Sequence, residues 1–316
     1  MEEGDSYFLK IENVTKIFAP HNLYIKNKNF DCLKSVDDVS FTIKKGETVG
    51  LVGASGSGKS TLGKILVRLL TPTSGKVIYK GLDIFSLTNK QFSGFRKDLQ
   101  MVFQNSYAAL NNMLNVKQIL IEGLRTNNIC SRNKENEVID YLLDLVELGK
   151  KDKFKHPSEL SGGQCQRVGI ARSLLVEPEF IVFDEATSAL DVIVQHKIVD
   201  VIKKIQKKMN LTYLFISHNI ALVEDVADRI AVMYGGKIVE IGPTKVICNN
   251  PIHPYTKRLI KAYKSLYVSK NYVEQAYNRD FECDFGNKCK MQERFCEKSK
   301  PALKLVEKDH FVICNN

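Results

Sequence analysis

Apolar and polar residues alternate along the first part of the chain in the pattern that predicts β-strands. Residues 7–18 and 36–43 alternate with a period of two, as strands with one buried face do. Residues 19–35 between them are polar and irregular, which predicts a loop. Residues 47–52 form a short strand that runs into a glycine-rich segment, and residues 60–70 have a helical pattern. The pattern therefore predicts strands first and a helix directly after glycines.

Further along the chain, short apolar strands alternate with helical segments. Strands are expected at residues 75–80, 98–103, 179–183 and 211–216, a helix at 191–208 and a hairpin at 229–241. Apolar positions recur with a helical period from Val138 to Val146, which predicts a helical insert over about residues 90–176. Strands alternating with helices favour an α/β fold with a mainly parallel sheet core and a small antiparallel β subdomain.

Composition and charge narrow the class of protein. The 316 residues are 44% hydrophobic and 26% charged, which excludes a disordered or collagen-like chain. Pro251 and Pro254 mark a boundary, so we expect one domain over residues 1–250 and a C-terminal extension over 251–316. The net charge of +10 fits nucleic acid, anionic lipid or phosphorylated ligands, although a solvated lysine-rich surface is the simpler interpretation. No run of about 18 apolar residues occurs, and the acidic start lacks a secretory pattern, so a cytosolic chain is expected.

The strongest motif is a glycine-rich loop between a strand and a helix. It fits the phosphate-binding pattern G-x-x-x-x-G-K-[ST], whose backbone N–H groups face a polyphosphate at a helix N-terminus. Lys59 is expected to reach the β- and γ-phosphates, and Ser60 to bind Mg²⁺. A glycine-rich turn without a ligand is the weaker alternative. The predicted nucleotide-binding residues of this loop are Gly53, Ser55, Gly56, Ser57, Gly58, Lys59, Ser60 and Thr61.

Two carboxylates follow the buried strand Phe180–Phe183. They lie at the carboxyl end of a parallel strand, the edge at which ligands bind in open α/β sheets. Asp184 is expected to hold Mg²⁺, and Glu185 to polarise the water that attacks the γ-phosphate. Alone, such a pair could cap the following helix; together with the glycine-rich loop it indicates nucleotide hydrolysis.

The segment Leu160–Gln164 reads LSGGQ, and here the chain resembles the ATP-binding cassette (ABC) ATPases. In that family the segment contacts the nucleotide held by a partner cassette. Ser161 and the N–H groups after it open a helix whose positive end suits an anion, and Ser161 is also a helix cap. The residues that this resemblance assigns to nucleotide contact are Ser161, Gly162, Gly163 and Gln164.

Further motifs occur in the order that the family has. Gln104 resembles the glutamine that touches Mg²⁺ and the attacking water, and His218 resembles the switch histidine at the γ-phosphate. Asp191 ends the segment that crosses between the two cassettes. Phe18 is the candidate for stacking on adenine, with Tyr24 as a competitor. The resemblance therefore implies an ATPase in which two cassettes enclose ATP, with Glu185, His218 and Gln104 as catalytic residues.

Residues 250–256, Asn-Pro-Ile-His-Pro-Tyr-Thr, resemble a box of the oligopeptide and dipeptide importer ATPases, and the loops resemble their F-type subunit. This resemblance implies a D-type ATPase partner, two transmembrane permease subunits, an extracytoplasmic peptide-binding protein and a place at the cytoplasmic face of the membrane. Nucleic acid is not expected as a partner. Nickel or another small solute is the alternative cargo, and a non-transport ABC ATPase acting on nucleic acid is a remote alternative.

Four of the eight cysteines lie near the C-terminal end: Cys283, Cys289, Cys296 and Cys314. Four thiolates can hold a [4Fe–4S] cluster or a tetrahedral Zn²⁺. Short C-x2-4-C pairs, which zinc sites favour, are absent, and the resembling subfamily has members with an iron–sulfur cluster in this tail. An iron–sulfur cluster is therefore expected, with zinc, unligated or disulfide-forming cysteines as alternatives.

Overall fold

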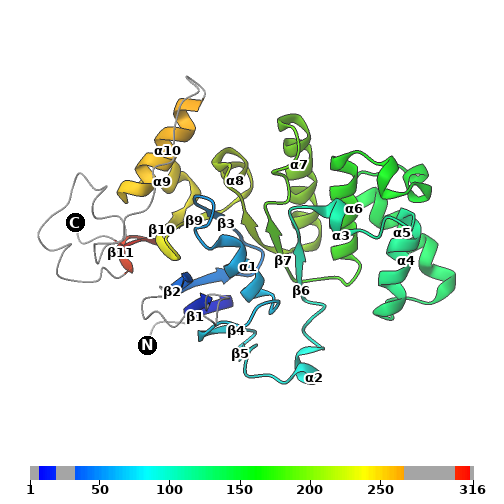
Figure 1. Cartoon of the computed structure of the whole chain (residues 1–316), viewed down its shortest axis with the longest axis horizontal. Coiled ribbons are helices and arrows are strands. Elements are labelled where there is room, and N and C mark those ends of the chain that lie inside the picture. Colours follow the sequence, from blue (N-terminus) through cyan, green and yellow to red (C-terminus); the bar gives the residue numbers. More distant parts are fainter. Residues whose placement is uncertain (1–6, 19–32, 267–302, 314–316) are drawn as a thin grey trace, which may run out of the picture.

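A computed structural model of the chain describes residues 7–18, 33–266 and 303–313. Two sheets and a helical lobe make up this part of the molecule (Figure 1). The strands are β1 (Tyr7–Phe18), β2 (Leu33–Lys44), β3 (Thr48–Val52), β4 (Ser74–Tyr79), β5 (Leu82–Asp83), β6 (Leu99–Val102), β7 (Phe180–Asp184), β8 (Thr212–Ile216), β9 (Arg229–Tyr234), β10 (Lys237–Pro243), β11 (Leu303–Glu307) and β12 (His310–Ile313).

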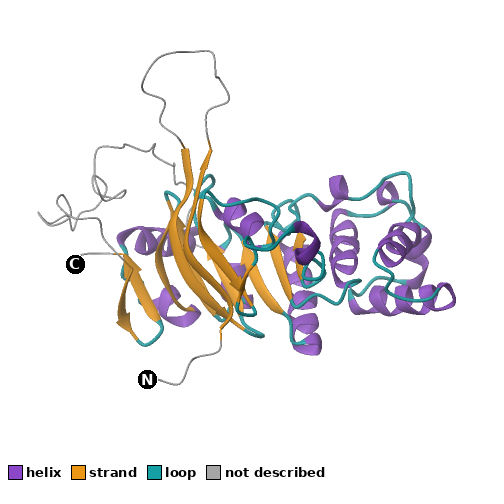
Figure 2. Cartoon of the chain, turned by 90° about the horizontal axis from the view of Figure 1, so that it is seen from below, coloured by secondary structure: helices purple, strands orange, loops and turns teal. Residues whose placement is uncertain are grey.

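A helix lies between each two parallel strands that are consecutive in the chain, as the sequence predicts, and α3 to α6 all lie between β6 and β7. They are α1 (Lys59–Leu66), α2 (Asn89–Phe92), α3 (Ser106–Ala109), α4 (Val116–Thr126), α5 (Glu135–Leu145), α6 (Gly162–Leu174), α7 (Val192–Met209), α8 (Ile220–Val226), α9 (Thr244–Asn249) and α10 (Pro254–Leu266). Helices α4, α5 and α6 gather at one end of the molecule, beyond β6, and α10 lies toward the other end (Figure 1). Figure 2 shows this helical lobe standing apart from the strands, which confirms a helical insert.

The larger sheet has the strand order β11-β12-β10-β9-β3-β8-β7-β6 among the described residues. Its five strands from β9 to β6 pair in parallel, whereas β10, β12 and β11 continue it antiparallel. The smaller sheet, of order β2-β1-β4-β5, is antiparallel. The predicted parallel core, antiparallel subdomain and helical insert are confirmed for these residues. The predicted cysteine-bearing C-terminal appendage is not confirmed, because its cysteines lie outside them.

Two apolar clusters cover the two faces of the parallel strands. Phe180 and Val182 of β7 pack into the cluster shared with α1 and the antiparallel sheet, whereas Ile181 and Phe183 pack into the cluster shared with the helical lobe. Successive side chains of a strand point to opposite faces, so a strand covered on both sides must be apolar throughout. This double cover fixes the carboxyl end of β7, where Asp184 and Glu185 emerge.

The end of the chain extends the main sheet. Strand β12 pairs with β10 at Glu240 and Ile241, and β11 pairs with β12. The carboxylate of Glu240, which is 0% exposed, accepts hydrogen bonds from the backbone N–H groups of Ile252 and His253 and lies 2.8 Å from Nε2 of His310. A buried charge needs such partners. One carboxylate thus holds both the C-terminal hairpin and the 250–256 segment. The domain boundary at residue 250 stays a prediction.

Buried His253 gives the fold a testable pH dependence. Burial lowers the pKa of His253 from 6.5 to about 4, and its Nδ1 accepts a hydrogen bond from the N–H of Tyr255. The unfolded chain therefore takes up a proton at this histidine near pH 6.5, and the native chain does so only near pH 4. The contribution of neutral His253 to the free energy of unfolding is fully present above pH 6.5. It is lost as the pH drops toward 4, and the loss is about 3 kcal/mol at most.

We expect His253→Asn to remove this component, because an asparagine oxygen can accept the same hydrogen bond without titrating in this range. The measurement is urea unfolding of both proteins between pH 8 and pH 4. The difference between wild type and variant should change with pH between 6.5 and 4 and level off below 4. Parallel curves over the whole range would contradict the assignment.

Candidate functional site

The glycine-rich loop follows β3 and ends at α1. Gly58 caps the helix with φ of 104°, and a Cβ placed there would lie 2.0 Å from the carbonyl oxygen of Ser35. An L side chain fits neither that backbone conformation nor that space. Ser55 and Gly56 are exposed, Ser57 is buried, and Thr61 Oγ1 lies 2.9 Å from Ser35 Oγ. The loop is therefore exposed at Ser55 and Gly56 and tightly packed where it joins α1.

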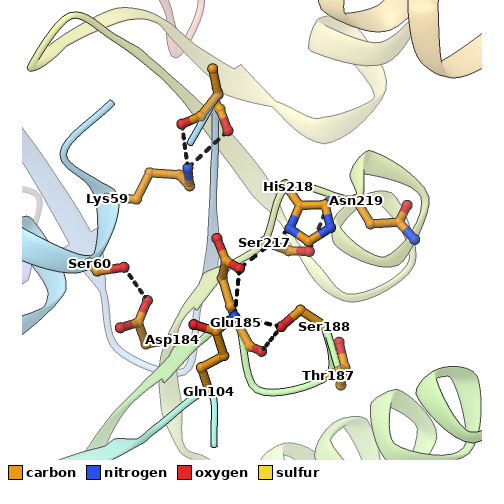
Figure 3. Close-up of polar contacts among 12 residues, drawn as sticks. Lys59, Ser60, Gln104, Asp184, Glu185, Thr187, Ser188, Ser217, His218 and Asn219 are labelled. Carbon is orange, nitrogen blue, oxygen red and sulfur yellow. Dashed lines mark hydrogen bonds and ion pairs between the residues drawn. The ribbon is translucent and has the colours of Figure 1, made fainter. Parts of the chain in front are cut away.

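Lys59 begins α1 and is 4% exposed. Its amine donates to the carbonyl oxygens of Gly53 at 2.9 Å and Ala54 at 2.7 Å, so it bridges the loop (Figure 3). Burial lowers the pKa of Lys59, and the charges of Glu185 and Asp184 act against that shift. A buried cation beside two carboxylates, at a helix N-terminus, is suited to a polyphosphate anion.

Ser60 and Asp184 meet at the start of α1. The Ser60 hydroxyl donates to Oδ1 of Asp184 at 2.7 Å, and Asp184 is 7% exposed (Figure 3). Burial raises the pKa of Asp184, and the hydrogen bond from Ser60 opposes that shift. Mg²⁺ prefers oxygen ligands and uses one or two carboxylates together with water and phosphate oxygens. The hydroxyl and the carboxylate fit that need.

Glu185 stands at the centre of a polar group built from three loops. It follows β7 with a left-handed φ of 47°, and its N–H donates to Ile216 O in β8. This turn aims its carboxylate across the ends of the strands, where Oε2 lies 3.4 Å from Nδ1 of His218 and 3.4 Å from Nε2 of Gln104 (Figure 3). The three predicted catalytic residues thus meet at one carboxylate.

Gln104 has a second partner that the sequence did not single out. Its Nε2 donates to Oγ of Ser188 at 3.1 Å, and that hydroxyl donates to the carbonyl oxygen of Glu185 at 3.0 Å. Ser188 belongs to the segment Ser188–Asp191, so the segment and the glutamine are coupled directly. In the sequence, the indication of a role for Ser188 was its place in the segment that ends at Asp191.

Asp191 and Ser161 both act as helix caps. The Asp191 carboxylate accepts from the N–H of Val194 at 3.0 Å at the start of α7. Ser161 and Gln164 form a reciprocal capping box at the start of α6, and Ser161 and Gly162 are exposed. A Cβ on Gly163 would lie 2.5 Å from Val194 Cγ1, so α6 and α7 approach closely there.

The signature residues Ser161–Gln164 and the glycine-rich loop Gly53–Thr61 remain separate. No hydrogen bond or ion pair joins them within residues 33–266. Phe18 ends β1 with a 40% exposed side chain, and the amine of Lys16 lies 5.3 Å from its ring centroid. Tyr24, its competitor, lies outside the described residues.

The prediction of an iron–sulfur cluster is wrong. Among the described residues, no group of three or more His, Cys, Asp or Glu side chains could hold a metal ion. Cys283, Cys289, Cys296 and Cys314 all lie outside those residues. The described end of the tail is held instead by strand pairing to β10 and by the Glu240–His310 contact. Three other cysteines, Cys130, Cys165 and Cys248, have free thiols.

Two protein families match separate parts of the chain. The family described as ABC transporter matches residues 36–188, and the one described as oligopeptide/dipeptide transporter, C-terminal region, matches residues 239–297. The first range contains the glycine-rich loop, the signature and Glu185, and the second contains the 250–256 segment and three of the four tail cysteines.

Curated relatives extend the likeness over nearly the whole chain. The oligopeptide transport ATP-binding protein AppF of Bacillus subtilis is 38% identical, over 97% of this chain and 96% of the relative. The oligopeptide transport ATP-binding protein OppF of the same organism is 47% identical over 73% of this chain and 76% of its own length.

Solved structures share the fold. A dimeric bacterial ABC transporter cassette, MJ0796, has a TM-score of 0.64 at 29% identity, over 75% of this chain and 98% of its own. The same cassette in a post-hydrolysis dimer bound to ADP and phosphate has a TM-score of 0.64 at 28% identity, over the same shares of both chains. These matches and the geometry of the site place the chain in a family: it is an ABC ATPase, whose substrate is ATP with Mg²⁺, and it belongs to the oligopeptide transport ATP-binding proteins of the ABC transporter family.

Proposed function

We propose that this chain hydrolyses ATP to power the import of oligopeptides or dipeptides through a membrane permease. The observation that supports hydrolysis most directly is the convergence of Gln104 and His218 on the carboxylate of Glu185. The peptide cargo is supported by the match of residues 239–297 to the peptide-transporter C-terminal region and by the names of the relatives.

Phosphoryl transfer depends mainly on positioning and on charge. In the proposed mechanism the loop amides and Lys59 hold the β- and γ-phosphates, and the carbonyl oxygens of Gly53 and Ala54 orient the Lys59 amine at the loop. Ser60 and Asp184, with Gln104 nearby, would hold Mg²⁺, which would supply positive charge against the phosphates. Phe18 stacks on the adenine. The loop residues predicted above are the nucleotide-binding residues of this mechanism.

Glu185 accepts a proton from the water as the water oxygen attacks the γ-phosphorus. The bond from that phosphorus to the β–γ bridging oxygen breaks. His218 contacts the γ-phosphate and, through its 3.4 Å contact with Glu185, holds the carboxylate toward the water. The products are ADP and phosphate, and the proton on Glu185 passes to phosphate or solvent. General base catalysis of this kind contributes about 10²–10⁴-fold to the rate.

The signature acts on a second subunit in this proposal. Ser161 and Gly162 are exposed at the N-terminus of α6, and no hydrogen bond or ion pair joins them to their own glycine-rich loop in the described residues. A pair of cassettes placed head to tail brings them to the ATP of the neighbour, with Asp191 near the crossing. The neighbour is a D-type ATPase subunit, and the assembly includes two transmembrane permease subunits and an extracytoplasmic peptide-binding protein.

No helix within the described residues is long and apolar enough to cross a membrane. The proposed location is the cytoplasmic face of the cell membrane, where the helical lobe meets the permease.

The test is uptake of labelled dipeptides and oligopeptides in cells that lack this chain. Uptake should be lost, should return with the wild-type chain, and should stay absent with Glu185→Gln produced at the same level. Nickel uptake is measured in the same cells and should not change. Peptide uptake that persists without the chain, or a defect confined to nickel, would overturn the proposed cargo.

A further inference from the structure

The 250–256 segment reaches the ATP site through one hydrogen bond. The backbone N–H of Ala54, the second residue of the glycine-rich loop, donates to the phenol oxygen of Tyr255 at 2.9 Å. The two residues are 201 positions apart in the sequence. Ala54 N–H shares its peptide plane with the carbonyl group of Gly53, and that carbonyl accepts a hydrogen bond from the Lys59 amine at 2.9 Å.

A trans peptide holds its N–H and its C=O in one rigid plane, where the two bonds point in opposite directions. Tyr255 therefore fixes the side of the plane that faces away from Lys59, and the Gly53 carbonyl is held toward the lysine. A Cβ at position 53 would lie 2.1 Å from the carbonyl oxygen of Met233, so only glycine fits there. Because glycine restricts its backbone least, this peptide plane gains from an outside support. The bond to Tyr255 holds the N–H end of this peptide, whereas the Lys59 amine contacts its C=O end.

Tyr255 is itself held on two sides. Its ring lies 4.5 Å, centroid to centroid, from the ring of Tyr234 at the end of β9. Its N–H donates to Nδ1 of His253 at 3.1 Å, and His253 is 3% exposed. Burial lowers the pKa of this imidazole to about 4, so it is a neutral acceptor at ordinary pH. The tyrosine is therefore a rigid support for the loop.

The support continues to the end of the described chain. Glu240 accepts the N–H groups of Ile252 and His253 and contacts the ring of His310 in β12. A series of hydrogen bonds thus runs from the C-terminal hairpin through Glu240 and His253 to Tyr255, and from there to Ala54. Every member of the series is buried or half-buried, where hydrogen bonds are strong and costly to break.

We propose that Tyr255 is a positioning residue of the ATP site, which orients the Gly53–Ala54 peptide and through it Lys59, and that the C-terminal segment is by this contact part of the site. The inference rests on the nucleotide-binding role proposed for the glycine-rich loop. In this proposal Tyr255 does not contact ATP. It orients the glycine-rich loop, which binds ATP.

The experiment compares Tyr255→Phe with the wild type in the full chain. The phenylalanine keeps the ring packing on Tyr234 and removes the acceptor of the Ala54 N–H. The dissociation constant for Mg-ATP and the KM of ATP turnover should both rise about five- to tenfold, as loss of one supporting hydrogen bond allows. The kcat should stay within twofold, because Glu185 and His218 are untouched.

Tyr213→Phe is the matched control. The hydroxyl of Tyr213 is buried in β8 and has no hydrogen-bond partner in the described part of the chain, and Tyr213 pairs with Thr48 at the end of β3 remote from the loop. Its ATP affinity should equal that of the wild type. Wild-type affinity in Tyr255→Phe, or an equal loss in Tyr213→Phe, would overturn the proposal.

A second measurement does not depend on how the variant folds. Hydrogen exchange of the wild-type chain without nucleotide should show the Ala54 amide protected and the exposed Ser55 amide exchanging faster. Equal, fast exchange of both would overturn the proposal. Lys59→Ala separates failure of the ATP site from failure of the inference about Tyr255. If Lys59→Ala weakens ATP binding about a hundredfold while Tyr255→Phe has no effect, the ATP site stands and the inference about Tyr255 fails.

Discussion

Glu185→Gln is expected to lower ATP turnover by at least about a hundredfold while ATP binding stays within twofold of the wild type. The amide keeps the size of the carboxylate and its place after β7, but it cannot accept the proton of the attacking water. Lys59, Ser60 and Asp184 remain in place, so the nucleotide still binds. ATP should accumulate uncleaved on the protein, and in the assembled transporter the cassettes should stay closed on it.

The measurement is phosphate release in the steady state, together with the chemical state of the bound nucleotide after rapid filtration. Glu179→Gln is the control, because Glu179 directly precedes the same strand at its opposite end and forms an ion pair with Lys80. Its turnover should stay within twofold of the wild type. Retention of a tenth or more of the activity in Glu185→Gln would refute the role assigned to this carboxylate.

Lys59→Ala should weaken Mg-ATP binding by about a hundredfold, since hydrogen bonds to charged groups contribute about 1.5–3 kcal/mol each. The lysine is buried among the loop carbonyls and two carboxylates, so its removal deletes the cation that faces the phosphates. Thermal unfolding, measured in parallel, separates this loss from collapse of the loop. The affinity is measured by titration of a fluorescent ATP analogue.

Lys45→Ala is the matched control for that variant. Lys45 is exposed in the turn before β3, at the end of the strand opposite the glycine-rich loop. It removes the same charge from the same chain, so a loss of affinity shared by both variants would indicate a general effect of net charge. ATP binding by Lys59→Ala at wild-type strength would exclude the proposed place of the phosphates.

The sequence could predict the parallel core because the constraints there are local. Every residue of β7 is buried, and Phe180–Phe183 are apolar. Asp184 ends the strand and Glu185 follows it, so the two carboxylates lie at its carboxyl end. The glycine-rich loop could also be predicted from the sequence, because Gly58 has a backbone conformation and a close contact that exclude other residues. In both places a short stretch of sequence meets nearly all the physical requirements of its structure.

Long-range contacts could not be predicted in the same way. Strands β11 and β12 join the main sheet through β10, and the exposed side chains of β11 give no apolar alternation that reveals the pairing. The bond from Ala54 to Tyr255 depends on where α10 begins relative to β3, which no local pattern encodes. The prediction of a metal cluster rested on the number and spacing of the cysteines. The described part of the tail is held instead by strand pairing and by the contact of Glu240 with His310.

A single measurement tests the central claim, that ATP is enclosed between the glycine-rich loop of one cassette and the signature of another. Ser161→Arg places a long cation at the exposed start of α6, away from the chain's own loop. ATP turnover of the assembled transporter carrying this variant is compared with ATP affinity of the isolated variant. We predict a loss of turnover of about a hundredfold with affinity unchanged; full turnover, or affinity lost in the isolated chain, would contradict the account.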